Sequence, residues 1–165
     1  MLTGVIRAYL AKRIPPSPAW PFRLSELAAA ALMVECARID GAFTNGERAA
    51  ICRAVTEGFG LDDETAQCLV GVAEMREEAV WHDWLFTETV RRSFDGYDRL
   101  AVIQRLWEVA LADGTVHPFE ESLITRIAGA LEIPEKAVDH RLSIALRRHP
   151  VLASLTLDAA ARHSP

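Results

Sequence analysis

The stretch Glu35-Cys-Ala-Arg-Ile-Asp40-Gly41, followed by Glu47, decides the fold because the chain repeats it. The second copy is Glu108-Val-Ala-Leu-Ala-Asp113-Gly114, followed by Glu120, and each matched residue lies 73 positions after its counterpart. The same shift pairs five further residues with identical ones: Leu27, Ala28, Ala37, Ile51 and Arg53. Gap-free similarity at a fixed spacing is typical of a duplicated structural unit. We therefore predict two copies of one helical unit, related by a pseudo-twofold axis, with an acidic loop at the same point in each.

The composition favours helices over strands. Half of the 165 residues are apolar and only 7 % are aromatic, which suits one domain with a substantial core made of packed helices. Alternation of apolar and polar residues with period two does not stand out in any segment. We predict an all-α domain of about seven to eight helices.

Capping and breaking residues place the helices along the chain. Thr44-Asn-Gly-Glu47 matches a capping box, and His117-Pro-Phe-Glu120 puts proline at the first helical position and glutamate at the third. Gly41 and Gly60 follow helices that they should end. Asp98 is a candidate cap for a helix that continues to Asp113.

Prolines divide the chain into three parts. Residues 1–23 are expected to form a helix over 2–13 and then a proline-rich strap. Residues 24–149 form the helical domain, and residues 150–165 form a C-terminal tail that begins at Pro150. We expect the N-terminal helix to dock onto the domain or onto a second subunit, so a homodimer is one expected assembly.

Charge and cysteine content restrict the function. A net charge of −5 argues against general nucleic-acid binding, which needs clustered Lys and Arg. The longest apolar stretch, residues 27–34, is far shorter than the roughly 20 residues that span a bilayer. Short basic clusters at 91–92 and 147–149 still permit peripheral contact with an anionic surface. Three cysteines without a Cys-x-x-Cys pair, and no signal peptide, predict a cytoplasmic protein.

The aspartates of the two loops lie where a carboxylate is unfavourable. Asp40 and Asp113 each follow a helix, and a negative charge at that end costs roughly 0.3–1 kcal/mol. One interpretation is local, because an Asp side chain can accept a backbone N–H two or three residues on. The other is a shared cation, because hard metals prefer oxygen ligands. Glu47 and Glu120 also have two interpretations. Helix capping alone would explain them, and the other interpretation is contact with a metal or a partner.

Two further glutamates extend the acidic set. Glu35 falls on an otherwise apolar helix face, where a carboxylate must be paired or coordinated. Glu108 occupies the equivalent place, and Arg105 lies one turn before it. Pairing to Arg105, or to the repeated arginines Arg53 and Arg126, is one interpretation. The other is a divalent cation (Ca²⁺, Mg²⁺, Mn²⁺ or Zn²⁺) bound by six candidate ligands: Glu35, Asp40, Glu47, Glu108, Asp113 and Glu120. The spacing is not that of an EF-hand, because glycine directly follows the first aspartate.

The motifs Ala-Arg-x-Asp-Gly-x(5)-Glu at residues 37–47 and Trp-Glu-Val-Ala-x-Ala-Asp-Gly-x(5)-Glu at residues 107–120 resemble the TerB family. That family includes tellurite-resistance proteins and a related domain of membrane-anchored co-chaperones. The resemblance covers roughly residues 24–142. It implies an all-helical, internally symmetric domain whose acidic loops handle a metal. It also implies a role in tellurite resistance or the stress response, exercised through protein partners and without enzymatic activity.

Motifs of catalysis do not emerge from the sequence. It contains no His-Glu-x-x-His, no Gly-x-Ser-x-Gly and no phosphate-binding glycine loop, so we predict no catalytic residues. The expected function is a non-enzymatic TerB-like binding module. One alternative is a purely structural protein–protein interaction domain without a metal. The other is a hydrolase-like enzyme that uses the carboxylates with a metal.

Overall fold

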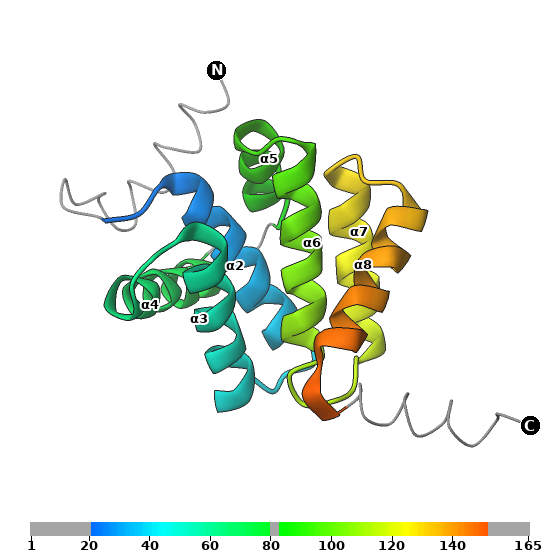
Figure 1. Cartoon of the computed structure of the whole chain (residues 1–165). Helices are drawn as coiled ribbons and strands as arrows, with labels where there is room; N and C mark the ends of the chain where they lie inside the picture. The colour runs from blue at the N-terminus through cyan, green and yellow to red at the C-terminus, as the bar shows by residue number, and fades with distance from the viewer. Residues whose placement is uncertain (1–20, 80–82, 152–165) are drawn as a thin grey trace, which may run out of the picture.

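The prediction of an all-α domain is confirmed. The computed structural model describes residues 21–79 and 83–151, which form seven α-helices and no strand (Figure 1). The helices are α2 (Leu24–Arg38), α3 (Asn45–Phe59), α4 (Asp63–Ala79), α5 (Asp83–Ser93), α6 (Gly96–Ala110), α7 (Pro118–Ala130) and α8 (Glu135–Arg148). The helix expected over residues 2–13, most of the strap and the tail beyond residue 151 lie outside the described residues. In the described ranges, no helix is both long enough and apolar enough to cross a membrane.

Helix α2 is the centre of the domain. It contacts α3, α4, α5, α6 and α7, and in Figure 1 the other helices surround it. All residues from Leu27 to Val34 are at most 1 % exposed. A helix that is apolar all round has to be buried, and the run of four alanines at 28–31 lets its neighbours approach closely.

Helix α6 occupies the corresponding place in the second half of the chain. It packs against α8, α2, α3 and α7, and its buried face carries Ile103, Leu106 and Val109. Helices α2 and α3, like α6 and α7, are joined by a loop that contains Asp-Gly. The pseudo-twofold relation between the two halves stays a prediction.

Most predicted helix ends agree with the structure. Thr44 is the N-cap of α3, His117 is the N-cap of α7, and Pro118 is the first residue of that helix. Gly60 ends α3 with a left-handed backbone (φ +66°). A residue without a Cβ adopts that conformation at little cost, which explains the stop.

The predicted start of α6 at Asp98 is wrong by one turn. The N-cap is Asp95, whose Oδ1 accepts the N–H of Asp98 at 2.9 Å. Asp98 is therefore the third residue of the helix, and starting earlier satisfies a backbone N–H that would otherwise face water. The helix also ends at Ala110 rather than at Asp113, because residues 111–114 form a turn.

The burial of α2 predicts that its alanines tolerate no enlargement. Ala30 is completely buried, so Ala30→Leu should lower the free energy of unfolding by about 1–3 kcal/mol through overpacking. The measurement is urea unfolding followed by circular dichroism. Ala49→Leu, on the exposed face of α3, is the control and should stay within about 0.5 kcal/mol of wild type. Equal stability of the two variants would contradict the central position of α2.

Candidate functional site

The first Asp-Gly loop is a tight turn built by its aspartate. The N–H of Gly41 donates to the carbonyl oxygen of Arg38 at 2.9 Å, and the N–H of Ala42 donates to Oδ1 of Asp40 at 2.9 Å. Gly41 has φ +87°, a conformation that L side chains rarely adopt. Asp40 therefore shapes the loop with one of its two carboxylate oxygens, as the local interpretation predicted.

The second loop makes the same contacts. The N–H of Gly114 donates to the carbonyl oxygen of Leu111 at 2.8 Å, and the N–H of Thr115 donates to Oδ1 of Asp113 at 3.1 Å. Gly114 has φ +95°. The two loops, 73 positions apart in the sequence, thus share one local conformation.

The glutamates that follow the loops cap α3 and α7, as predicted. The N–H of Thr44 donates to Oε2 of Glu47 at 2.6 Å, and the N–H of His117 donates to Oε2 of Glu120 at 2.7 Å. In return, Thr44 Oγ1 accepts the N–H of Glu47, and His117 Nδ1 accepts the N–H of Phe119. Both glutamates are only 3 % exposed. The capping hydrogen bonds therefore hold one oxygen of the Glu47 carboxylate and one of the Glu120 carboxylate in place at the helix starts.

The structure brings four of the six predicted carboxylates into one electrostatic cluster, which we call the acidic cluster: Asp40, Glu47, Asp113 and Glu120. The two loops lie together at one end of the helices (Figure 1). Burial raises the pKa of Glu120 to about 7, against the lowering effect of the hydrogen bond from His117. The negative charges of Asp40, Glu47 and Asp113 raise this pKa further.

Cys36 lies beneath this cluster. Its thiol is completely buried. Burial raises the pKa of the Cys36 thiol well above its ordinary value, and the charges of Glu120, Glu35, Glu47 and Asp40 raise it further. The thiol is therefore protonated at neutral pH, as is usual for a cysteine buried among apolar residues. Glu35 itself is half-buried, and its charge acts on this thiol from the last turn of α2.

Among the side chains that the structure describes, in residues 21–75 and 85–151, no salt bridge reaches Asp40, Glu47, Asp113 or Glu120. Ordinary surface carboxylates at such proximity would repel one another, and burial strengthens that repulsion. This repulsion adds to the effect of burial, which is the larger cause of the raised pKa of Glu120.

Glu108 lies outside the acidic cluster. Of the interpretations offered for it, pairing with an arginine agrees with the structure, but the arginine is not Arg105. The partner is Arg148 of α8, whose Nη1 lies 2.8 Å from Oε1 of Glu108. Gln104 also donates to that oxygen at 3.0 Å. Arg105 instead crosses to α3, where its Nε donates to the carbonyl oxygen of Ala54 at 3.1 Å. Arg148 can reach Glu108 because α8 packs directly on α6.

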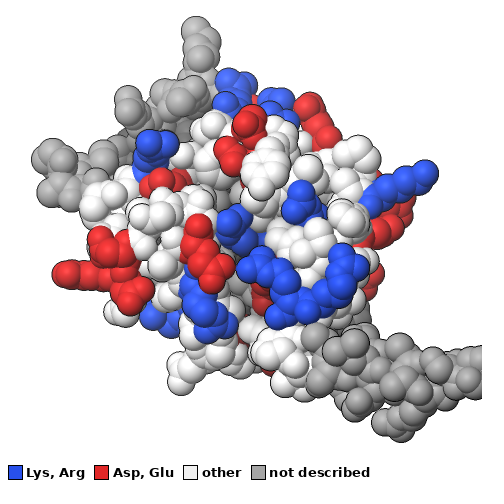
Figure 2. Space-filling view, viewed as in Figure 1, with Lys and Arg blue, Asp and Glu red and all other residues white. Residues whose placement is uncertain are grey.

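The predicted basic clusters are largely paired within the domain. Arg91 and Arg92 lie in the last turn of α5, and both form salt bridges with Glu88. Arg148, in the last turn of α8, bridges Glu108 and Glu57. Basic side chains gather over α6 and α8 in Figure 2, with acidic ones among them. These arginines sit where a helix dipole favours cations.

The donor set of the acidic cluster fits a hard cation in chemistry. Within the described residues, no group of three or more His, Cys, Asp or Glu side chains already has an arrangement that could hold a metal ion. Each of the four carboxylates nevertheless uses one oxygen in its loop or cap and has no hydrogen bond on the other within those ranges. Oxygen donors suit Ca²⁺, Mg²⁺ and Mn²⁺ better than Zn²⁺. His117 uses Nδ1 to cap α7, and the protonated Cys36 offers no thiolate.

Sequence reasoning missed two residues around this site. Cys36 directly follows Glu35 in the repeated motif, and its place inside the quoted stretch was a usable signal. Arg148 lies outside the repeated register and 40 positions from Glu108. Only the packing of α8 on α6 reveals that pair, so no spacing in the sequence could have indicated it.

The fold and the loops together define a class of protein. It is an all-α domain with two Asp-Gly turns at one end, each followed by a glutamate that caps the next helix. A family model described as Tellurite resistance protein TerB matches residues 26–142, which include both loops. The chain therefore belongs to the TerB family, a helical and generally non-enzymatic family, and the resemblance seen in the sequence is confirmed. No curated protein and no solved structure matches the chain.

The acidic cluster predicts a pH-dependent stability. The pKa of Glu120 is raised to about 7 from an ordinary 4.5, so the folded protein holds a proton that the unfolded chain releases between these values. Stability should therefore fall as the pH rises through this window, by on the order of 1–3 kcal/mol. Urea unfolding at about pH 5 and about pH 7.5, with a chelator present, measures this change.

Two variants isolate the group responsible. Glu120→Gln keeps an oxygen acceptor for His117 N–H but does not titrate, so the loss of stability with rising pH should largely disappear. Glu121→Gln removes the same charge at the neighbouring exposed position and should keep the wild-type dependence. If Glu120→Gln and wild type lose equal stability, Glu120 is not the titrating group.

Proposed function

We propose that this chain is a non-enzymatic, cytoplasmic TerB-like binding module of the tellurite or general stress response, whose two Asp-Gly loops together bind one divalent cation. Asp40, Glu47, Asp113 and Glu120 would hold the ion, and Ca²⁺, Mg²⁺ or Mn²⁺ suits their oxygen atoms. The observation that carries the proposal is that the charges of Asp40, Glu47 and Asp113 all act on the buried Glu120, while no salt bridge reaches any of the four among the described side chains.

The energetics of the acidic cluster support a cation. Glu47 and Glu120 are almost completely buried, and buried carboxylates are stable when they are paired or coordinated. Protonation of Glu120 relieves part of the repulsion, but only below about pH 7. A divalent cation would relieve it at neutral pH and would displace that proton.

Occupancy of such a site would join the two halves of the domain. Asp40 and Glu47 belong to the loop and helix after α2, whereas Asp113 and Glu120 belong to those after α6. A cation that contacts both loops binds the folded state alone, so it adds to stability by mass action. This coupling suits a sensor or carrier that presents one surface to its protein partners when the ion is bound and another when it is absent.

A protein-interaction domain without a metal is the second candidate. Its support is that every acid of the cluster already has a role in a turn or a cap. Phe119, 60 % exposed beside the second loop, offers an apolar contact at the same end. A second copy of the chain is one partner that this candidate accommodates.

Calorimetric titration of the metal-stripped protein with Ca²⁺, Mg²⁺, Mn²⁺ and Zn²⁺ tests the proposal. We expect saturable binding of at least one of the first three ions by wild type, and its loss in Asp40→Asn combined with Asp113→Asn. Below about pH 7 the heat should also vary with the ionisation enthalpy of the buffer, because binding releases the Glu120 proton.

A charge-matched control separates a site from a general effect of net charge. Glu135→Gln combined with Asp139→Asn removes two exposed carboxylates of α8 and should bind the ion as wild type does. If wild type binds no ion, and the loop variant only melts at a lower temperature, the carboxylates serve fold architecture and the interaction-only candidate stands.

A further inference from the structure

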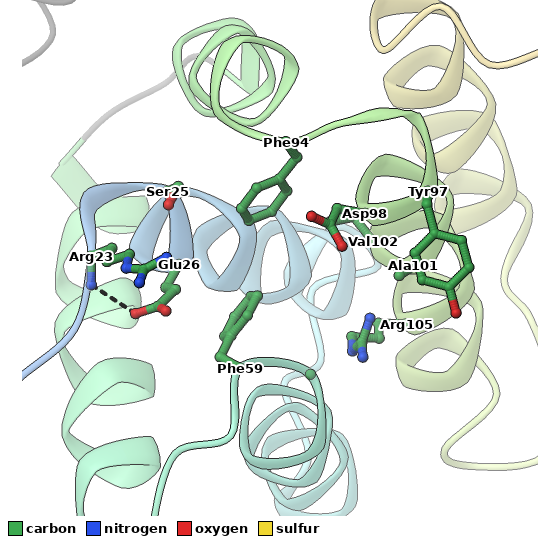
Figure 3. A pocket seen from close by; sticks show the side chains of 11 residues that line it. Arg23, Ser25, Glu26, Phe59, Phe94, Tyr97, Asp98, Ala101, Val102 and Arg105 are labelled. Atoms are coloured by element: carbon green, nitrogen blue, oxygen red, sulfur yellow. Dashed lines mark hydrogen bonds between the residues drawn. The ribbon is translucent and has the colours of Figure 1, made fainter.

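A pocket of about 340 Å³ lies at the end of the helices opposite to the Asp-Gly loops (Figure 3). Its walls come from the start of α2, the end of α3, Phe94 before α6, and α6 as far as Arg105. The Asp-Gly loops, by contrast, follow the end of α2 and the end of α6. The pocket is therefore separate from the acidic cluster and from the proposed cation.

One side of the pocket is apolar. Phe59 and Phe94 point toward one another, with ring centroids 6.2 Å apart and ring planes tilted by 43° (Figure 3). At this distance the two rings pack on each other and form one apolar wall. Val102 is buried, and Tyr97 also lines the pocket, with 75 % of its surface exposed. A flat apolar group can pack against such a wall.

The other side carries the guanidinium of Arg105. A Cβ on Gly58 would lie 2.5 Å from its Nε, 2.6 Å from its Cζ and 2.7 Å from its Nη2. The guanidinium therefore lies directly on the backbone of α3, in space that only glycine leaves free. Its Nε donates to the carbonyl oxygen of Ala54, which fixes the direction of the group.

The terminal nitrogens of Arg105 are available to a ligand. Neither Nη1 nor Nη2 has a hydrogen-bond acceptor or a salt bridge in the part of the chain that the structure describes. Partial burial lowers the pKa of this guanidinium below its ordinary value, while the negative charges of Glu108, Glu57 and Asp98 act in the opposite direction. A guanidinium held in place with two free donors matches the geometry of a carboxylate.

The charges around the pocket restrict the anion. Glu26 and Asp98 line it together with Arg23 and Arg105. Oε2 of Glu26 accepts the backbone N–H of Arg23 at 2.7 Å. The two arginines and two carboxylates sum to zero charge, so a carboxylate with one negative charge meets less repulsion here than a phosphate or a nucleotide with two or more.

We infer that this pocket is a second binding site, which takes a small organic acid with one carboxylate and an aromatic body. The carboxylate pairs with the terminal nitrogens of Arg105, and the aromatic body lies against Phe59, Phe94 and Val102. Arg105 gives specificity for the charge, and Gly58 is the positioning residue that lets the guanidinium reach this place.

Titration of the full-length, ¹⁵N-labelled protein with phenylpropionate tests the inference, with a chelator present to exclude metal effects. We expect saturable shifts of the amide signals of Gly58, Phe59 and Phe94. Phenylpropionamide has the same body without the charge and should bind at least about tenfold more weakly. Inorganic phosphate should not shift these signals in a saturable way.

Three variants separate ligand binding from a structural role of Arg105. Arg105→Gln removes the charge but keeps an N–H donor, and should weaken phenylpropionate binding by about tenfold or more while phenylpropionamide is unaffected. Gly58→Ala keeps the charge but displaces the guanidinium, and should also weaken binding. Arg53→Gln removes an exposed arginine of the same helix and should bind as wild type does.

Several results would overturn the inference. These are the absence of saturable shifts in wild type, equal affinity for the acid and the amide, or unchanged affinity in a folded Arg105→Gln protein. In each case Arg105 would serve only to clamp α6 to α3. If Arg105→Gln does not fold, the acid–amide comparison in wild type and the Gly58→Ala variant still decide the matter.

Discussion

The burial of α2 on every side is the constraint on which the other features depend. Because this helix is apolar all round and rich in alanine, five other helices can pack directly against it. Its two ends are then the places where polar chemistry can reach the surface. The end near Asp40 carries the acidic cluster, and the start near Arg23 opens on the pocket. The domain therefore keeps its two candidate sites apart by the length of one buried helix.

Capping is the interaction that concentrates charge at the first of these ends. A glutamate at the third position of a capped helix must turn its carboxylate back toward the loop. Glu47 and Glu120 do so at the starts of α3 and α7, and the charge of Glu47 then acts on the buried Glu120. The favourable local bonds thus create an unfavourable non-local repulsion, which a proton on Glu120 reduces. The same logic explains why the Cys36 thiol beneath them stays protonated.

Local contacts could be predicted from the sequence, and contacts between distant segments mostly could not. The turns at Asp40 and Asp113 and the caps at Thr44 and His117 involve residues two or three positions apart, so residue type and spacing determine them. The start of α6 was misjudged because Asp95 and Asp98 are both acceptable caps, and the choice depends on how early the helix can begin. The pairing of Glu108 with Arg148 depends on where α8 packs, and the position of Arg105 depends on the bare backbone at Gly58. Neither the Glu108–Arg148 pair nor the position of Arg105 can be predicted from residues that are close in the sequence.

The roles of the acidic residues in the fold and in cation binding do not exclude one another, because a carboxylate has two oxygens. The turns use Oδ1 of Asp40 and Asp113, and the caps use Oε2 of Glu47 and Glu120. The second oxygen of each is left without a hydrogen bond within the described residues, on side chains whose directions the first oxygen has already fixed. No three of these acids in the described residues already stand in an arrangement that could hold a metal ion, so a cation would have to draw the second oxygens together. The structural role therefore leaves one oxygen of each acid for the proposed binding role, but does not by itself build the site.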